Sequence, residues 1–177
     1  MKLTIGIPTY NRAIYLDNLL RSIYSAYSQY SIIELKIYIR DNNSTDNTKE
    51  IVEKWSEKLS IQYRKLDNTV SGLINIIKIV EGYEGEGLFW FMGDDDEIVP
   101  IGFQIIDQLA SKYKDGIDII LANRYICKQK RDEVKIFDGE VDQCFYKYYE
   151  CFSINNHISF SKYLDNVKNA AGIFGLI

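Results

Sequence analysis

The stretch that decides the fold runs from Leu88 to Pro100 and reads Leu-Phe-Trp-Phe-Met-Gly-Asp-Asp-Asp-Glu-Ile-Val-Pro. Its first half is a near-continuous apolar run that predicts a buried strand, and three carboxylates follow directly, those of Asp94, Asp95 and Asp96. Crowded carboxylates repel one another, whereas a divalent cation turns the same oxygens into ligands. Carboxylate oxygens suit Mg²⁺ or Mn²⁺, which often complete their ligand shell with water and phosphate oxygens. The stretch therefore suggests a metal-bridged phosphate site at the end of a strand.

The same acidic residues also have a simpler interpretation. Acidic side chains commonly solvate loops and the first turn of a helix, and a helix is expected to begin near Pro100. Taken alone, the cluster fits a polar strand-to-helix turn as well as it fits a metal site. The rest of the chain has to decide between the two.

Composition limits the classes of function. With 177 residues, of which 46% are hydrophobic, the chain can fill one globular core, so one domain is the default. Its net charge of −4 argues against a nucleic-acid partner. The apolar run Leu3–Ile7 is too short for a secretory signal, and no run is long enough to span a membrane. We therefore expect a cytoplasmic protein.

Cysteine and histidine chemistry is not indicated. The three cysteines show no Cys-x-x-Cys spacing, so neither a disulfide framework nor a zinc site is expected. His157 is the only histidine, so a histidine-dependent nucleophilic mechanism would have to use that residue alone.

Strand and helix patterns alternate along the chain. The expected strands are Leu3–Ile7, Glu34–Arg40, Ile61–Lys65, Leu88–Met92 and Ile117–Ala122, and the expected helices are about Ala13–Ser28, Thr45–Leu59, Gly72–Val80 and Ile101–Tyr113. Such alternation is typical of right-handed βαβ units. The fold class is therefore α/β, with a mostly parallel, Rossmann-like sheet and helices on both faces.

Polar turns follow three of these strands. They are Thr9-Tyr10, Asp41-Asn42 and Asp94-Asp95-Asp96. Because ligands of such sheets bind outside the carboxyl ends of the strands, we expect the three turns to share one rim. Together they could supply an aromatic face for a base, polar groups for base or ribose, and a metal site for a diphosphate. No P-loop and no Gly-x-Gly-x-x-Gly turn follows the first strand. We therefore do not expect a nucleotide to bind in the P-loop mode or in the classical dinucleotide mode.

The motifs on these turns resemble those of family 2 glycosyltransferases with the GT-A fold. The matching segments, in order, are Leu3–Arg12 (LTIGIPTYNR), Ile39–Asp46 (IRDNNSTD) and Phe91–Asp96 (FMGDDD). The resemblance covers roughly residues 1–125, which would form the nucleotide-sugar-binding core, and residues 126–177 would begin an acceptor-side region. It implies transfer of a sugar, with inversion, from a nucleotide diphosphosugar, commonly UDP-linked. The acceptor would be a saccharide or glycolipid in cell-surface polysaccharide synthesis.

The resemblance also implies roles for individual residues. Asp41 or Asn42 would contact the base, and Asp94 would lie near the ribose. The implied nucleotide-binding set as a whole is Pro8, Thr9, Tyr10, Arg12, Asp41, Asn42, Asn75 and Asp94. Asn75 is the weaker member, since the Arg often found beside this Asn is replaced by Ile74.

The implied cofactor is Mn²⁺ or Mg²⁺, with Asp95 as principal ligand and Asp96 as a second. The family often has Asp-x-Asp-Asp at this motif, and Gly93 stands where the first Asp is usual. The division of labour among Asp94, Asp95 and Asp96 therefore stays open at this point.

The end of the chain suggests a fragment. Residues 170–177 form an apolar run without a polar tail, and no downstream carboxylate matches the family's base motif. We therefore expect the general base beyond Ile177, and peripheral association with the inner face of a membrane in a longer protein. Two other functions remain open: a nucleotide-sugar-binding module without turnover, and a metal-dependent nucleotidyltransferase, for which Arg12 alone is thin support.

Overall fold

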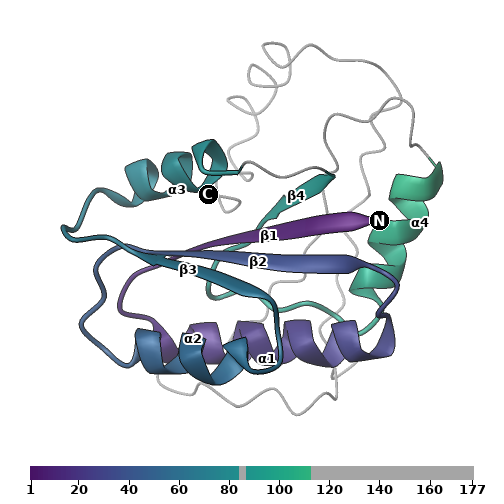
Figure 1. Cartoon of the computed structure of the whole chain (residues 1–177), viewed down its shortest axis with the longest axis horizontal. Helices are drawn as coiled ribbons and strands as arrows, with labels where there is room; N and C mark the ends of the chain where they lie inside the picture. The colour runs from purple at the N-terminus through teal and green to yellow at the C-terminus, as the bar shows by residue number, and fades with distance from the viewer. Residues whose placement is uncertain (84–86, 113–177) are drawn as a thin grey trace, which may run out of the picture. The chain divides into compact units, whose positions relative to one another are not determined.

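The computed structural model describes residues 1–83 and 87–112 (Figure 1). In chain order the elements are β1 (Lys2–Thr9), α1 (Ala13–Gln29), β2 (Glu34–Asp41), α2 (Thr48–Ser56), β3 (Ile61–Lys65), α3 (Gly72–Glu81), β4 (Leu88–Phe91) and α4 (Gly102–Lys112). Every strand and helix predicted for this part of the chain is present. The strand predicted at Ile117–Ala122 and the region 126–177 lie outside the described residues.

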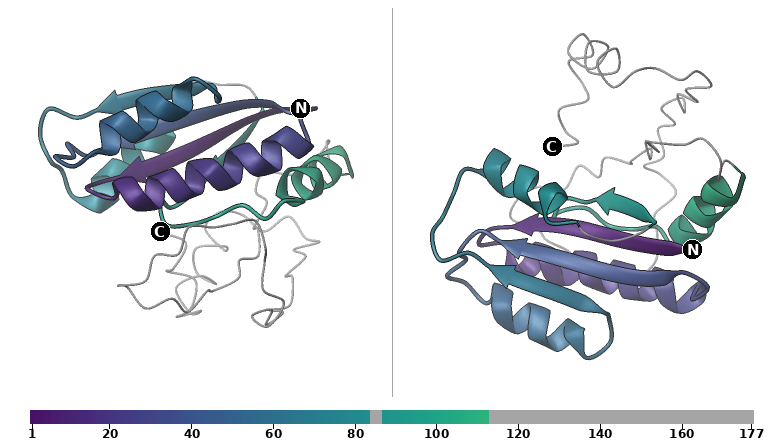
Figure 2. Two further views of the ribbon diagram at one scale, coloured as in Figure 1. Left: turned by 90° about the horizontal axis from the view of Figure 1, so that it is seen from below. Right: turned by 45° about the horizontal axis from the view of Figure 1, so that its top comes forward.

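The strands form one parallel sheet in the order β3-β2-β1-β4. Helices α1 and α2 cover one face of this sheet, and α3 lies on the other (Figures 1 and 2). The predicted α/β class, with helices on both faces of a parallel sheet, is therefore confirmed. Of the helices in residues 1–83 and 87–112, none has both the length and the apolar character needed to cross a bilayer.

The core lies between the sheet and α1. Alternate residues of β1 and β2 point into it, and α1 adds apolar side chains at the i, i+3, i+4 and i+7 spacing of one helix face. The fully buried members are Leu3, Ile5, Ile7, Ile37, Ile39, Leu16, Leu19, Leu20 and Ile23. This spacing, readable in the sequence, explains why α1 lies flat against the two central strands.

A polar cluster, which we call the Asp17 clamp, fastens α1 to α2. Asp17 Oδ1 accepts hydrogen bonds from Trp55 Nε1 (2.6 Å) and Lys54 Nζ (2.8 Å), and Oδ2 accepts one from Arg21 Nη2 (3.1 Å). Burial by itself would raise the pKa of Asp17, but the hydrogen bonds from Lys54, Trp55 and Arg21 outweigh it, so the pKa is lowered. The clamp therefore favours the ionised carboxylate.

Two details differ from the sequence expectation. Helix α2 begins at Thr48, not Thr45, because Asp46 Oδ1 accepts from the Thr48 backbone N–H (3.1 Å) and hydroxyl (2.5 Å) and so ends the preceding loop. Strand β4 was expected to be buried, yet all four of its residues are only partly buried. The reason is its place at the end of the described strand order, where β1 is its hydrogen-bonded neighbour.

Close contact between β1 and β4 depends on one glycine. A Cβ placed on Gly6 would lie 2.3 Å from Cζ of the Phe89 ring, which no real side chain tolerates. The missing side chain lets the β4 ring lie over the central strand. The parallel pairing of β4 with β1 brings the end of β4, and the acidic turn after it, next to the end of β1.

Candidate functional site

The strand order creates a switch point between β1 and β4. From β1 the chain proceeds outward through β2 and β3, and then returns to place β4 on the other side of β1. The ends of β1 and β4 are therefore neighbours at the carboxyl end of the sheet, which is where ligands of open parallel sheets bind.

Hydrogen bonds join the three predicted turns at this point. The Asn42 backbone N–H donates to the Thr9 carbonyl oxygen (2.9 Å), which ties the ends of β2 and β1. Thr9 Oγ1 donates to Asp94 Oδ2 (2.8 Å), which ties the end of β1 to the acidic turn after β4. The expectation that the turns share one rim is therefore confirmed.

Arg12 forms an ion pair with the acidic turn. Its Nη1 lies 2.9 Å from Asp94 Oδ1 and 3.1 Å from Asp95 Oδ2. The Asp94 side chain is buried, at 7% exposure, whereas those of Asp95 and Arg12 are 53% and 45% exposed. One guanidinium nitrogen thus bridges a buried carboxylate and a solvent-facing one.

Burial and hydrogen bonding oppose each other at Asp94. Burial raises the pKa of this carboxyl group, the hydrogen bonds from Arg12 and Thr9 lower it, and burial is the stronger effect. The hydrogen bond with Asp94 in turn raises the pKa of Arg12. A carboxyl group with a raised pKa at a strand-end rim is typical of a functional site.

The acidic turn folds around Gly93. The Gly93 backbone N–H donates to Asp96 Oδ2 (3.0 Å), and a Cβ placed on Gly93 would lie 2.9 Å from Asp95 Oδ1 and 3.2 Å from Asp96 Oδ2. The absent side chain therefore leaves room between two carboxylates. An Asp at this position, as in the related motif, would have to displace them.

This arrangement fits a hard divalent cation with few protein ligands. In residues 1–83 and 87–112 no group of three or more Asp, Glu, His or Cys side chains is arranged to hold a metal ion. Two carboxylates with water and phosphate oxygens in the remaining positions are, however, a usual environment for Mg²⁺. The oxygen ligands of Asp95 and Asp96 therefore suit the predicted Mg²⁺ or Mn²⁺.

Asp41, at the end of β2, is fully buried. Its Oδ1 accepts from the Ser44 backbone N–H (2.8 Å), and its Oδ2 accepts from the hydroxyl of Tyr63 in β3. Burial and this hydrogen bond raise the pKa of Tyr63, so the phenol stays protonated and remains a donor. No local sequence pattern pointed to Tyr63, because its pairing depends on β3 lying beside β2.

The loop that follows β2 is fastened to the turn that follows β1. The Asn11 backbone N–H donates to Ser44 Oγ (2.9 Å), and Asn11 Oδ1 accepts from the Thr45 N–H (2.7 Å). Asn11 has a φ of 52° and Asn43 a φ of 68°, a left-handed conformation that Asn adopts more readily than most residues. The two loops therefore hold each other in position.

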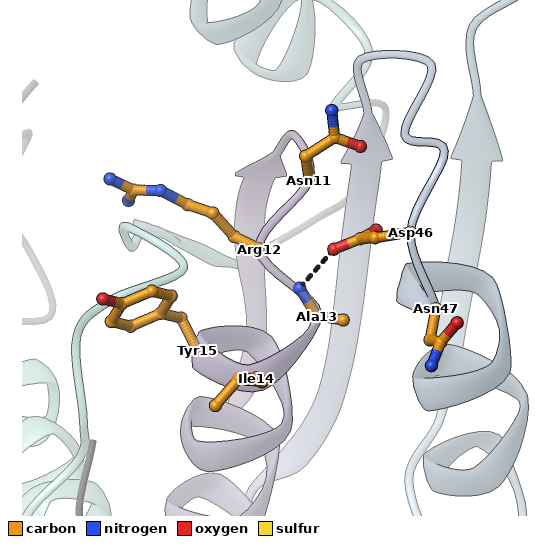
Figure 3. Close-up of a pocket in the computed structure, with 7 residues that line it drawn as sticks. All are labelled: Asn11, Arg12, Ala13, Ile14, Tyr15, Asp46 and Asn47. Atoms are coloured by element: carbon orange, nitrogen blue, oxygen red, sulfur yellow. Dashed lines mark hydrogen bonds between the residues drawn. The ribbon is translucent and has the colours of Figure 1, made fainter. Parts of the chain in front are cut away.

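A pocket of about 290 Å³ opens beside this contact (Figure 3). Residues 11–15 line one side and Asp46 and Asn47 the other, and Asp46 Oδ2 accepts from the Ala13 N–H at 2.9 Å. The sequence did not indicate this pocket. It shares Arg12 with the acidic-turn site.

The remaining predicted nucleotide residues fall into two groups. Tyr10 is exposed just beyond β1, Pro8 lies within β1, and Asn42 exchanges hydrogen bonds with the Val70 backbone (both 2.8 Å). Asn75, in contrast, is buried at 3% exposure. It pairs with Arg40, accepting from Nε (3.1 Å) and donating to the carbonyl oxygen (3.2 Å). Asn75 thus joins α3 to β2 at Arg40.

Comparison with known proteins agrees with this geometry. Residues 4–173 match the family described as Glycosyl transferase family 2. The chain is 27% identical over 173 residues to the abequosyltransferase RfbV of Salmonella typhimurium, covering 90% of this chain and 51% of RfbV. It is 33% identical over 99 residues to the poly(ribitol-phosphate) beta-N-acetylglucosaminyltransferase TarS of Staphylococcus aureus, covering 56% of this chain and 17% of TarS. The chain therefore spans about half the length of RfbV and less of TarS.

Solved structures show the same fold. S. aureus TarS 1–349 in complex with UDP-GlcNAc matches with a TM-score of 0.54 at 24% identity, covering 73% of this chain and 39% of that chain. The mannosyltransferase PcManGT of Pyrobaculum calidifontis, in complex with GDP-Man and Mn²⁺, matches with a TM-score of 0.51 at 21% identity, covering 64% and 32%. These likenesses confirm the GT-A type of α/β fold.

The family match, the relatives named as glycosyltransferases and the fold point the same way, and they favour this class over the nucleotidyltransferase considered from the sequence. Since the match spans residues 4–173 of 177, the chain belongs to glycosyl transferase family 2.

Proposed function

We propose that this chain is the donor-binding part of an inverting glycosyltransferase. It would bind a nucleotide diphosphosugar, UDP-linked in the first instance, for transfer to a saccharide or glycolipid acceptor in cell-surface polysaccharide synthesis. The observation that carries the proposal is the meeting of the turns after β1, β2 and β4 at the switch point, joined by the contacts of Asp94 with Thr9 and Arg12. Family membership and relatives that are themselves sugar transferases support it.

The nucleoside would lie along the ends of β1 and β2. Tyr10 offers an exposed ring on which a base or ribose could pack, next to the backbone of Pro8 and Thr9. Asp41 and Asn42 are buried and hydrogen-bonded to Ser44, Tyr63 and Val70, so they would shape the base site by holding the end of β2 in place. Asp94 would accept from a ribose hydroxyl. Asn75 would contribute indirectly, by holding α3 against β2 through Arg40.

The diphosphate would lie over the acidic turn. Asp95 and Asp96 would hold the divalent cation between them, in the space left by Gly93. A bound Mg²⁺ or Mn²⁺ supplies Lewis-acid stabilisation of the negative charge that develops on the leaving diphosphate. Arg12, anchored on the adjacent turn, would add a second positive charge on the same side.

Inverting transfer also requires a general base to take the proton of the attacking acceptor hydroxyl. The residues assigned above bind and orient the donor, and the base is not among them. On this assignment, the described part of the chain provides donor affinity, and turnover needs the acceptor side as well.

The proposal is tested by calorimetric titration of the chain with UDP, GDP, CDP and dTDP, each with and without Mn²⁺. We expect one nucleotide to bind, and to bind more tightly with Mn²⁺. No binding of any nucleotide in either condition would contradict the proposal. A turnover assay on this chain and on a C-terminally extended version then separates a transferase from a binding module, because a module would bind donor and stay inactive in both.

A further inference from the structure

The contact between Arg12 and the acidic turn has a role beyond donor binding. We propose that Arg12 is an internal counter-ion that pairs with Asp95 of the acidic turn when no donor is bound. When the donor binds, the Arg12 guanidinium leaves Asp95, which is then free to bind a divalent cation. The guanidinium instead pairs with the diphosphate. This inference rests on the proposed function, since it concerns the same site.

The geometry places Arg12 in direct competition with a cation. Its Nη1 lies 3.1 Å from Asp95 Oδ2, so the guanidinium partly neutralises one of the two carboxylates assigned to the metal. A charge at that distance also repels an incoming divalent cation. Removing the charge of Arg12 should therefore make the turn bind the metal ion alone more tightly.

The ion pairs of Arg12 with Asp94 and with Asp95 differ in how easily they break. The ion pair with Asp94 ends on a buried carboxylate, whose other oxygen accepts a hydrogen bond from Thr9 Oγ1 at 2.8 Å. The ion pair with Asp95 joins two side chains that are about half exposed, and ion pairs of that kind are weak. Arg12 can therefore give up Asp95 at little cost, while Asp94 keeps its place.

Only the Arg12 side chain has to move. The backbone of its turn is held by Asn11 and by the Ala13 N–H, which donates to Asp46 Oδ2. Figure 3 shows the guanidinium on the same side of the turn as Tyr15, away from Asp46, and Arg12 Cζ lies 5.4 Å from the centre of the Tyr15 ring. The ring can support the cation through its π face while the guanidinium turns toward a phosphate.

The test is Arg12→Gln, which removes the charge and keeps a polar side chain. Arg21→Gln is the matched control. Arg21 is also paired with an Asp and similarly exposed, at 38%, but it belongs to the Asp17 clamp. Binding of Mn²⁺ alone is measured from the free-Mn²⁺ electron paramagnetic resonance signal, and binding of UDP with saturating Mn²⁺ by calorimetry. Arg12→Lys keeps the charge and serves as a second variant if Arg12→Gln does not fold.

The expected effects have opposite signs. Arg12→Gln should bind Mn²⁺ alone roughly 2- to 5-fold more tightly, the range set by losing a partly exposed charge pair, and should bind UDP with Mn²⁺ several-fold more weakly. Arg21→Gln should match wild type in both, and Arg12→Lys should stay close to wild type for Mn²⁺. Unchanged or weaker Mn²⁺ binding in Arg12→Gln would overturn the counter-ion role, and undiminished UDP binding would overturn the pairing of Arg12 with the diphosphate.

Failure of this inference is distinguishable from failure of the proposed function. If the wild-type chain binds UDP but Arg12→Gln binds Mn²⁺ no more tightly than wild type does, the inference is overturned and the nucleotide site stands. A chain that binds Mn²⁺ more tightly after Arg12→Gln, yet binds no nucleotide, supports the counter-ion role and contradicts the proposed donor site.

Discussion

The Asp17 clamp and the acidic turn each pair an aspartate with an arginine, yet the pKa values of the two buried or partly buried aspartates, Asp17 and Asp94, shift in opposite directions. Asp17 receives three donors from two helices, and its pKa is lowered. At the acidic turn, a single nitrogen of Arg12 serves both Asp94 and Asp95, and the pKa of Asp94 is raised. The difference agrees with the proposed roles, because a structural carboxylate is fully paired by its own fold, whereas a binding site keeps charge that its ligand can neutralise.

The largest expected effect comes from removing a charge at the acidic turn. Asp95→Asn should weaken metal-dependent nucleotide binding by about 100-fold or more. Even the loss of a residue that only hydrogen-bonds to a metal ligand costs about 10- to 100-fold in metal affinity. Its melting temperature should stay close to that of wild type, because the Asp95 side chain is 53% exposed. Calorimetry and thermal unfolding measure the two. Binding that survives in this variant would remove Asp95 from the proposed metal site.

A substitution in the Asp17 clamp should lower stability and leave nucleotide binding unchanged, the reverse of the effect expected for Asp95→Asn. Asp17→Asn should lower the free energy of unfolding by about 1–3 kcal/mol, because donors from Lys54, Trp55 and Arg21 lose a charged acceptor. Nucleotide binding at a temperature where the variant is folded should be unchanged. Urea unfolding provides the measurement. A variant as stable as wild type would show that the clamp adds no stability, and a variant with impaired binding would show that the two regions are coupled.

The smallest expected effect is a difference in pH dependence. Because the pKa of Asp17 is lowered in the fold, its contribution is fully present above its unfolded-state pKa of about 3.9 and is lost as the pH falls through the lower folded value. The pKa of Asp94 is raised, so its ionisation costs stability above that pKa, and the cost disappears as the pH falls.

The two aspartates should therefore give opposite slopes. As the pH is lowered from 7 toward the range in which these carboxyl groups titrate, wild type should lose stability relative to Asp17→Asn and gain stability relative to Asp94→Asn. Urea unfolding of the three proteins across this range measures both slopes. Slopes of the same sign would contradict the opposite pKa shifts of Asp17 and Asp94.

Local pattern in the sequence was enough to predict much of the fold. The spacing of Leu16, Leu19, Leu20 and Ile23 predicted α1, and β3 was predicted with its observed bounds, Ile61–Lys65. These features depend on residues close together in the chain, where periodicity and turn formation act directly. The common rim also followed from the sequence, because parallel strands place their carboxyl ends on the same edge.

The contacts inside the site were not predictable in this way. Arg12 pairs with Asp94 across 82 residues, Asp17 with Trp55 across 38, and Tyr63 with Asp41 across 22. Each pairing needs a particular neighbour in space, which no local pattern specifies. The role of Gly93 likewise became clear only from the carboxylate oxygens on either side of it.

By itself, the sequence determined which segments form strands and helices and which turns carry the polar chemistry, since these depend on hydrophobic periodicity and turn residues. Tertiary structure alone decided that β4 lies beside β1, that the Phe89 ring of β4 packs against Gly6 of β1, and that Arg12 meets Asp94 and Asp95. The physical reason is that strand order and side-chain pairing are settled by packing between distant segments, and many partners of similar local character compete for each position.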